Sequence, residues 1–443
     1  MESADDAFGE PGEAISDRPK HGFEDNQSSF TDHSAHIGQI LRQRGDVSAQ
    51  QFADAIDRQS VSGCRVGEEL IGHGDVRAFD FYRALAAQRG TPFVNLLLSP
   101  PDPNLLDPDD LGFYLQHQCL PWKSVATTPA YVAVDLEAAA AALKEKTGQP
   151  FLLYQTAPLD ILRTVQSTFG ADLTEEARSS LLRETPLASA QQLLSPRERA
   201  VFTLICCLIV ATVFFFPGKS LLALNIVTAV AFMALALLRL LSVRVARPTN
   251  AIPLSTRAQT LDHDLPLYTI MVPLLREAEV LPILMDALRK LDYPAAKLDI
   301  KLILEKTDAA TIAAPPAMAL PGNVKPIPVP SPQPMTNPKP CNYALAFARG
   351  ELLVVYDAED IPGPGQLRVA VCAFKAAGPQ LACVQAPLAY YNWNENWLTR
   401  HFAIEYAALF DLLVPALARF GLPFPLGGTS THFRTFVLRK VGA

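Results

Sequence analysis

The hydrophobic pattern of the chain changes character three times along its length. Up to about residue 90, apolar positions recur at helical spacing and short runs end in glycine, which predicts a series of short helices. From "TPFVNL" to about residue 185, short apolar runs such as "YVAVDL" alternate with stretches such as "LEAAAAALKEKTG", which predicts a small α/β unit. Residues 265–443 show strand, helix and strand at the spacing typical of a parallel sheet.

The helical segment contains an internal repeat. Residues 36–59 align without gaps to residues 65–88 after a shift of 29, and nine of the 24 aligned positions are identical. The identical positions include a Gly-Asp-Val turn that begins at Gly45 in one copy and Gly74 in the other. Each copy therefore predicts two helices joined by a turn, with residues 60–64 as the spacer between copies.

Two long apolar runs separate the predicted domains. Residues 200–216 carry no charge, and residues 221–238 contain only Asn225 as a strongly polar group. Each run is, with its flanks, long enough to cross roughly 30 Å of hydrocarbon. Arginines lie outside both runs, which predicts that both outer ends face the cytoplasm. We expect a transmembrane hairpin over residues 200–241 after a polar linker over 186–199; the alternative is a hairpin buried in a soluble core.

Composition narrows the range of partners. The net charge of −7 gives no bulk positive field, so no nucleic acid polymer is expected and any nucleotide must bind at a local site. The seven cysteines form no CxxC pair and no metal-ligand spacing with histidines, which indicates free thiols. Residues 1–33 are acidic, polar and almost free of large aliphatic side chains, which predicts a disordered leader.

Acidic residues follow three predicted strands of the C-terminal domain. Glu277 follows the first, Asp308 the second, and Asp357 and Glu359 the third. Ligands of an open parallel sheet bind beyond the carboxyl ends of its strands, so these side chains are the ones to expect at a site. Two carboxylates two positions apart suit Mg²⁺ or Mn²⁺, which prefer oxygen ligands; the alternative is a solvated turn.

Other stretches of this domain leave more than one interpretation. Residues 315–340 contain ten prolines, which predicts an extended loop on the surface. Residues 393–420 have apolar and aromatic positions at helical spacing, which predicts a helix either on the membrane surface or buried against the sheet. His432 would either contact an acceptor or satisfy a loop carbonyl.

The C-terminal domain resembles family 2 glycosyltransferases, especially the processive membrane type that includes cellulose synthase catalytic subunits. The matching segments stand in family order: "IMVPLLREAE", "LILEKTDAAT", "KPCNYAL", "VYDAED", "VQAPLAYYN" and "GGTSTHFR". The resemblance implies a GT-A (Rossmann-like) domain over residues 265–443, with a nucleotide-sugar donor, a polysaccharide acceptor and Mg²⁺ or Mn²⁺. The implied site residues are, for the donor, Glu277, Asp308 and Lys339; for the metal, Asp357 and Glu359; for the acceptor, Gln385, Gly428, Thr429 and Ser430.

In that family an acidic general base and a Gln-x-x-Arg-Trp motif follow the GGTS segment. The sequence ends at "RTFVLRKVGA" and contains neither element. Since a base must take the proton from the attacking hydroxyl, we expect this chain to bind a nucleotide sugar and to turn it over poorly or not at all.

The repeat resembles MshEN, the cyclic-di-GMP-binding N-terminal domain of type II secretion and type IV pilus ATPases. That pattern starts with Arg-Leu-Gly, has Gly at its tenth position and ends in Gln; the first copy departs from it at its first position. The resemblance implies a regulatory domain over residues 34–185. The implied cyclic-di-GMP site consists of His36, Gly38, Gly45, Gln59, Arg65, Gly67, Gly74 and Gln88. The alternative is a helical packing module whose glycines only end helices.

Together these resemblances predict a multi-pass glycosyltransferase of the inner membrane for exopolysaccharide synthesis, with both large domains cytoplasmic. Cyclic-di-GMP would bias the catalytic domain through the connector between the domains. The alternative is a non-catalytic cyclic-di-GMP receptor or scaffold of an exopolysaccharide synthesis or secretion system. The sequence leaves open which sugar is used and whether the messenger activates or inhibits.

Overall fold

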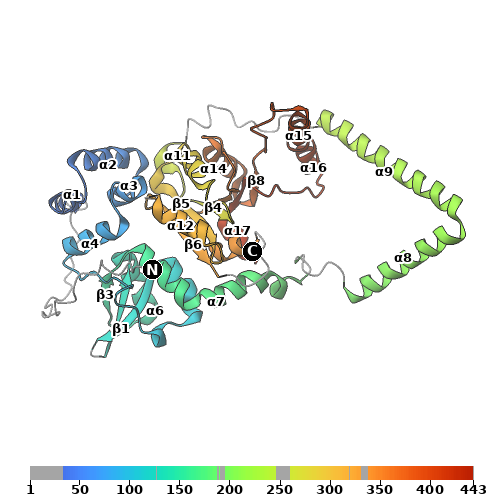
Figure 1. Cartoon of the computed structure of the whole chain (residues 1–443). Coiled ribbons are helices and arrows are strands. Elements are labelled where there is room, and N and C mark those ends of the chain that lie inside the picture. Colours follow the sequence, from blue (N-terminus) through green and yellow to red (C-terminus); the bar gives the residue numbers. More distant parts are fainter. Residues whose placement is uncertain are drawn as a thin grey trace, which may run out of the picture.

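The computed structural model describes residues 33–125, 127–186, 189, 195–245, 260–318, 320–330 and 338–442. The predicted leader, apart from its last residue, and much of the predicted linker lie outside the described residues. The described chain contains, in order, a four-helix segment, a small α/β domain, two long helices and a larger α/β domain (Figure 1). The mixed α/β fold that the sequence predicts is confirmed.

The first four helices form the predicted repeat. Their bounds are α1 His33–Gln43, α2 Ala49–Ser62, α3 Val66–His73 and α4 Ala78–Arg89. They enclose a small core in which Ile37, Leu41, Val47 and Ala55 of the first copy correspond, 29 positions later, to Val66, Leu70, Val76 and Ala84. The two copies therefore bury equivalent side chains, as expected for a duplicated unit that needs its neighbour to complete a core.

A small α/β domain follows the repeat. It contains α5 Leu111–His117, α6 Leu136–Thr147 and α7 Pro158–Glu184, two short 3₁₀ turns at Pro103–Leu105 and Pro108–Asp110, and strands β1 Cys119–Val125, β2 Thr128–Ala133 and β3 Leu152–Gln155. The strands form a sheet in the order β1-β2-β3, in which β1 and β2 are antiparallel and β2 and β3 are parallel.

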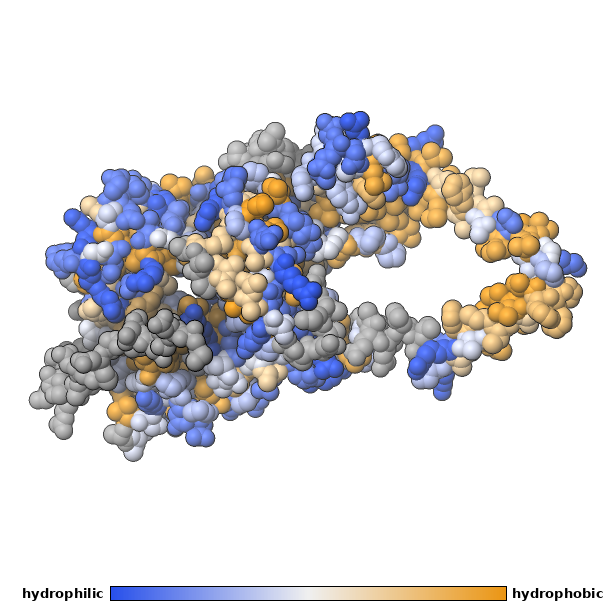
Figure 2. Space-filling model, in the orientation of Figure 1, coloured by the Kyte–Doolittle hydropathy of each residue, from blue (hydrophilic) through white to orange (hydrophobic). Residues whose placement is uncertain are grey.

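Two long helices, α8 Pro196–Phe215 and α9 Pro217–Val245, coincide with the two apolar runs. Apolar side chains cover both helices on the face shown in Figure 2, and no part of their apolar windows is buried within the protein. Among the described residues a third stretch, Trp397–Arg419, is also long and apolar enough to cross a membrane by length and composition. It consists of α15 Trp397–Ala407, the π-helical turn η7 Ala408–Leu413 and α16 Val414–Arg419, and it contacts α9.

The C-terminal domain is built on a six-stranded sheet with the order β6-β5-β4-β7-β9-β8. The first four of these strands in that order are parallel, and β9 runs antiparallel to both of its neighbours, which is consistent with a GT-A fold. The strands are β4 Tyr268–Leu274, β5 Leu298–Glu305, β6 Val324–Val329, β7 Leu352–Val355, β8 Cys383–Gln385 and β9 Thr431–Arg434. The helices are α11 Leu281–Arg289, α12 Ala309–Ala317, α13 Pro338–Leu345, α14 Gln366–Ala377 and α17 Thr435–Lys440, with 3₁₀ turns at Asp262–Asp264, Ala295–Lys297 and Gly378–Gln380.

The expectation of an extended surface loop over residues 315–340 is wrong in part. β6 lies inside this stretch and pairs in parallel with β5, although it contains Pro326 and Pro328. Proline is tolerated in a strand at the edge of a sheet, where one side needs no backbone donor, and β6 occupies that edge. The high proline content is therefore compatible with an edge strand, which the sequence pattern alone did not indicate.

The two faces of the large sheet are covered differently. Side chains of α11 and α14 cover one face. On the other face, Met271, Ile303 and Ile327 form one buried cluster with Tyr343 of α13 and with the N-terminal domain, including Phe169 of α7. The small domain and the sheet thus share a hydrophobic core.

The equivalent glycines Gly38 and Gly67 are sites of close packing. A Cβ atom at Gly38 would lie 2.3 Å from the ring of Phe52, and one at Gly67 would lie 2.1 Å from the ring of Phe81. The two phenylalanines are themselves 29 positions apart. The repeat therefore conserves within itself a contact between a helix backbone and an aromatic ring.

We predict that Gly67→Ala destabilises the repeat by about 1–3 kcal/mol, because overpacking forces the ring of Phe81 to move. Gly112→Ala is the matched control, since no atom lies within 4 Å of a Cβ at that helical position. Chemical unfolding of the two variants measures the difference. Equal stabilities, or no recovery in the Gly67→Ala/Phe81→Leu double variant, would contradict the packing explanation.

Candidate active site

A cleft opens at the carboxyl ends of β4, β5 and β7. Its volume is about 190 Å³, and four carboxylate residues line it: Glu277, Glu305, Asp357 and Glu359. They meet because parallel strands present their carboxyl ends at one edge of the sheet. The structure thus brings together three of the predicted site residues from two separate loops, and beside them it places Glu305, the last residue of β5, an acidic strand end for which the sequence pattern predicts no role.

The cleft is strongly acidic. Burial, together with the neighbouring charges of Asp360, Glu359 and Glu277, raises the pKa of Asp357 to about 6. Burial also raises the pKa of Glu277, with Glu359 and Asp308 adding to the effect. None of the described residues that line the cleft is cationic. Such a set of crowded oxygen donors suits a divalent cation.

Asp357 and Glu359 are the residues that would hold Mg²⁺ or Mn²⁺. Within the described part of the chain, no group of three or more His, Cys, Asp or Glu side chains is already arranged around a common point. Hard cations of this kind often keep water and substrate phosphates as further ligands, so two protein carboxylates fit the expected donor set.

Asp308 joins two loops at the edge of the cleft. Its side chain accepts hydrogen bonds from the backbone N–H of Thr311 at 3.2 Å and of Arg276 at 2.5 Å. The first bond caps α12, and the second holds the loop after β4, where Arg276 has a φ of 61°. Asp308 therefore fixes the position of Glu277, and it lies near the cleft without lining it.

Lys339, at the beginning of α13, is paired with Glu305 at 3.0 Å. Both side chains are buried, with exposed fractions of 3% and 6%. A buried pair of this kind is costly to break, so Lys339 anchors α13 to the floor of the acidic cleft, which is the predicted donor site.

The predicted acceptor segment docks on the acidic turn. The hydroxyl of Thr429 bonds to the carboxylate of Asp360 and accepts from the backbone N–H of Asp357 at 3.2 Å. Ser430, with a φ of 54°, donates its backbone N–H to Val355. Gly428 directly precedes Thr429 in this segment. The segment is thereby held next to the candidate metal residues.

Gln385 holds this loop from the side. Its amide oxygen accepts from the backbone N–H of Gly427 at 2.8 Å and from the hydroxyl of Thr431 at 2.7 Å, and its amide nitrogen donates to the backbone oxygen of Thr429 at 3.1 Å. These bonds use the amide within the protein, so the structure gives Gln385 a positioning role for the acceptor loop.

His432 is a core residue of β9. Its side chain is 1% exposed, and its Nδ1 lies 2.7 Å from the hydroxyl of Tyr268 in β4. Burial lowers its pKa to about 4. Of the two interpretations of His432, the structure supports neither: the partner is a tyrosine of the sheet.

The residues predicted for cyclic-di-GMP lie on the repeat in two equivalent sets. Gly45 and Gly74 end α1 and α3 with φ values of 73° and 78°. Their positions explain both glycines as helix ends, and Gly38 and Gly67 are explained by packing. Gln59 and Gln88 are half-buried near the ends of α2 and α4, and His36 lies within α1.

Arg65 differs from the glycines because its side chain lies at the surface and does not pack in the core of the repeat. Its side chain is 75% exposed, and it forms an ion pair with Asp135 of the small domain at 2.7 Å. Asp135 in turn caps α6 through the backbone N–H groups of Glu137 and Ala138. Arg65 thus lies at the junction between the repeat and the small domain.

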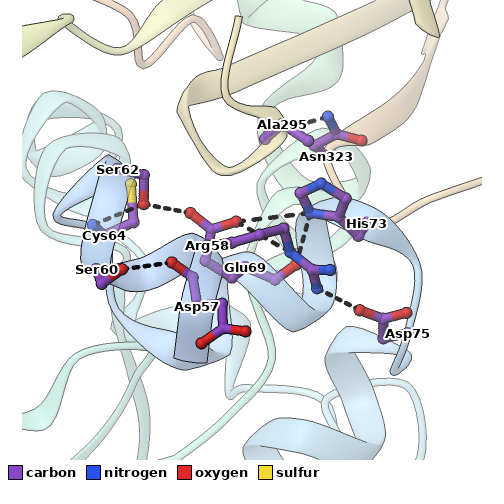
Figure 3. Close-up of polar contacts among 10 residues, drawn as sticks. All are labelled: Asp57, Arg58, Ser60, Ser62, Cys64, Glu69, His73, Asp75, Ala295 and Asn323. Carbon is purple, nitrogen blue, oxygen red and sulfur yellow. Dashed lines mark hydrogen bonds and ion pairs between the residues drawn. The ribbon is translucent and has the colours of Figure 1, made fainter. Parts of the chain in front are cut away.

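An ionic cluster surrounds Asp75 in the turn of the second copy. Arg58 lies 2.6 Å from Asp75 and 3.7 Å from the buried Glu69, as Figure 3 shows. Glu69 also accepts from the hydroxyl of Ser62. His73 lies 3.6 Å from Glu69. These contacts tie the turn of the second copy to α2, so the carboxylate of Asp75 has a structural partner.

Comparison with known families agrees with this architecture. Residues 266–443 match a family described as glycosyltransferase like family 2, and residues 89–175 match the MshEN domain. The chain carries a glycosyltransferase family 2-like domain and an MshEN domain. The MshEN match begins at the last residue of α4, so the repeat that holds the predicted cyclic-di-GMP residues precedes it.

Solved structures show weaker similarity. A mannosyltransferase from Pyrobaculum calidifontis in complex with GDP-Man and Mn²⁺ is 23% identical, with a TM-score of 0.32, over 40% of this chain and 47% of its own. MshE with cdg is 22% identical, with a TM-score of 0.26, over 30% of this chain and 97% of its own. S. aureus TarS in complex with UDP-GlcNAc is 16% identical, with a TM-score of 0.27, over 39% and 46%. No curated protein matches the chain.

We predict that His432 makes the glycosyltransferase domain less stable in mild acid. Its pKa is lowered on folding from 6.5 to about 4, so the unfolded chain binds the extra proton first. The free energy of unfolding that depends on the neutral His432 side chain is fully present above pH 6.5. It is lost as the pH falls towards 4. In His432→Gln, thermal unfolding should depend less on pH in this window. His263→Gln, at a half-exposed site, is the control; identical pH profiles for His432→Gln and the unmodified chain would contradict the assignment.

Proposed function

We propose that this protein binds a nucleotide-sugar donor and belongs to the machinery that transfers its sugar to a growing polysaccharide at the inner membrane, and that cyclic-di-GMP regulates it. The observation that carries the proposal is the meeting of Glu277, Asp357 and Glu359 in one cleft of a glycosyltransferase family 2-like domain. A cleft with this excess of carboxylates would repel a diphosphate unless a cation stood between them.

The geometry suggests a role for each group. A divalent ion held by Asp357 and Glu359 would neutralise the diphosphate that leaves with the nucleoside. Asp308 and the loop that it fixes would bound the nucleoside end of the donor. Thr429 and Ser430, held beside the acidic turn, would face the acceptor sugar.

The membrane part of the proposal rests on the apolar helices. α8 follows the MshEN domain, and α9 leads towards the glycosyltransferase domain, so a hairpin in the bilayer would leave both domains on one side. The arginines that flank the pair favour the cytoplasmic side. The stretch Trp397–Arg419 contacts α9 and would lie at or in the same membrane.

Regulation is supported by the physical contact between the domains. α7 of the MshEN domain and α13 of the glycosyltransferase domain pack together, and the side-chain amide of Asn342 donates to the backbone oxygen of Ala177 at 3.3 Å. A ligand that moves the MshEN domain would therefore act on α13, which begins beside the donor cleft.

Donor binding is the first test. We expect the full chain in detergent to bind a UDP-sugar or GDP-sugar in isothermal titration only when Mn²⁺ or Mg²⁺ is present. Asp357→Asn should weaken binding at least about tenfold, because it removes an anionic ligand of the ion. Asp286→Asn, at an exposed pair with Lys290, should leave affinity unchanged. Binding that persists in EDTA, or that Asp357→Asn leaves intact, would argue against this site.

Messenger binding is the second test. Titration of cyclic-di-GMP into the full chain should release heat that Arg65→Ala abolishes, because a guanidinium can pair with phosphate or a guanine edge. Arg83→Ala, at another exposed arginine of the repeat, should retain the heat. Absence of heat at high ligand concentration would leave the repeat as a packing module.

A further inference from the structure

A second and larger cavity lies between the two domains. Its volume is about 770 Å³, within the range of small-molecule sites. The MshEN side contributes residues of α5, α6 and α7, and the glycosyltransferase side contributes β5, β6 and the end of α13. Because successive residues of a strand advance by about 3.3 Å, its lining residue Lys301 lies about 13 Å before Glu305 along β5. The cavity is therefore separate from the donor cleft.

Four cationic residues line this cavity: Lys301, Lys325, Arg349 and Arg439. We call it the cationic cavity. Three of them surround one fully buried carboxylate, Asp299, at 2.9 Å from Lys301 Nζ, 3.5 Å from Lys325 Nζ and 3.5 Å from Arg349 Nε. Arg439 donates instead to the backbone oxygens of Leu345 and Ala348.

The acidic residues of the cavity do not cancel this charge. Asp135 is paired with Arg65 and caps α6, so its carboxylate is already engaged. Glu176 and Glu184 lie on α7 and are exposed to water, where their field is screened. The inner wall around Asp299 consequently keeps an excess of positive charge.

Such an excess is unfavourable in a buried place. The side chains of Lys301 and Lys325 are 1% and 11% exposed. Burial lowers the pKa of Lys325 well below its ordinary value, and the charges of Arg349 and Lys301 lower it further. One cation would suffice to neutralise Asp299. Buried like charges around a cavity are stabilised when an anion enters it.

We propose that the cationic cavity is a binding site for a phosphate-bearing ligand, contacted by Lys325, Arg349 and Arg439. The ligand would bridge the two domains, because its other wall belongs to the MshEN domain. It would also brace α13, since Asn342 and Leu345 of that helix line this cavity while Pro340 lines the donor cleft. This site is distinct from the repeat, and it stands whether or not the donor cleft is catalytic.

Thermal unfolding of the full chain in detergent tests the proposal, with inorganic pyrophosphate, UDP and cyclic-di-GMP as probes in EDTA. Removal of divalent ions suppresses diphosphate binding at the donor cleft. A bound ligand raises the unfolding midpoint in proportion to the logarithm of its concentration. Lys325→Met should increase the Kd of the occupying ligand at least tenfold, and Lys290→Met, at an exposed lysine, should not.

Two further variants make the outcome decisive. Arg349→Gln, at a side chain 38% exposed, serves if Lys325→Met does not fold, and it should weaken the same ligand. Asp357→Asn should leave that binding intact. A tenfold loss for any of the three probes supports the proposal and identifies the source of the phosphate. Unchanged Kd values for all three, or a loss that appears in Asp357→Asn in place of the cavity variants, would overturn it.

Discussion

The packing of α7 against one face of the large sheet is the contact on which the rest of the structure depends. Met271, Ile303 and Ile327 are buried in one cluster with residues of α13 and of the MshEN domain, and burial of such side chains contributes about 1.5–3 kcal/mol each. Phe169 and Tyr343 close the same cluster. The two domains thus contribute side chains to one buried cluster, and a close-packed core of this kind can transmit displacement. The donor cleft and the cationic cavity both border this core.

A single strand illustrates how this face is organised. Along β5, Asp299, Lys301, Ile303 and Glu305 alternate with apolar residues that point to the opposite face. The first two belong to the cationic cluster, the third to the shared core, and the last to the acidic cleft. Positive charge therefore gathers towards the start of the strand and negative charge at its end, with hydrophobic packing between. Opposite charges of this kind, held on one strand, would favour different ligands in the two cavities.

The sequence predicts the elements better than the contacts between them. The repeat, the parallel strands and the acidic residues after them follow from local periodicity and order. The sequence does not predict β6, because its prolines are atypical of a strand. The position of β6 at the edge of the sheet explains why these prolines are tolerated. The roles of Gln385 and Glu305 depend on partners 42 and 34 residues away, Gly427 and Lys339, which no local pattern identifies. Asp, Lys and Glu occur at alternate positions of β5 in the sequence. Their neighbours in the structure, however, belong to β6, α13 and the other domain.

The order of α7, the two apolar helices and β4 along the chain is relevant to how the two domains could be coupled. After α7 the chain enters the two apolar helices and returns at β4, which lies in the sheet that α7 covers. The helix before the two apolar helices, α7, and the strand after them, β4, therefore contribute side chains to the same buried cluster. Besides the expected path through the connector, this packing would give a displacement of the MshEN domain a direct path to α13 through Asn342 and the shared core. In the proposed arrangement the helices would hold the joined domains at the bilayer, and the coupling free energy would reside in the contact between α7 and α13.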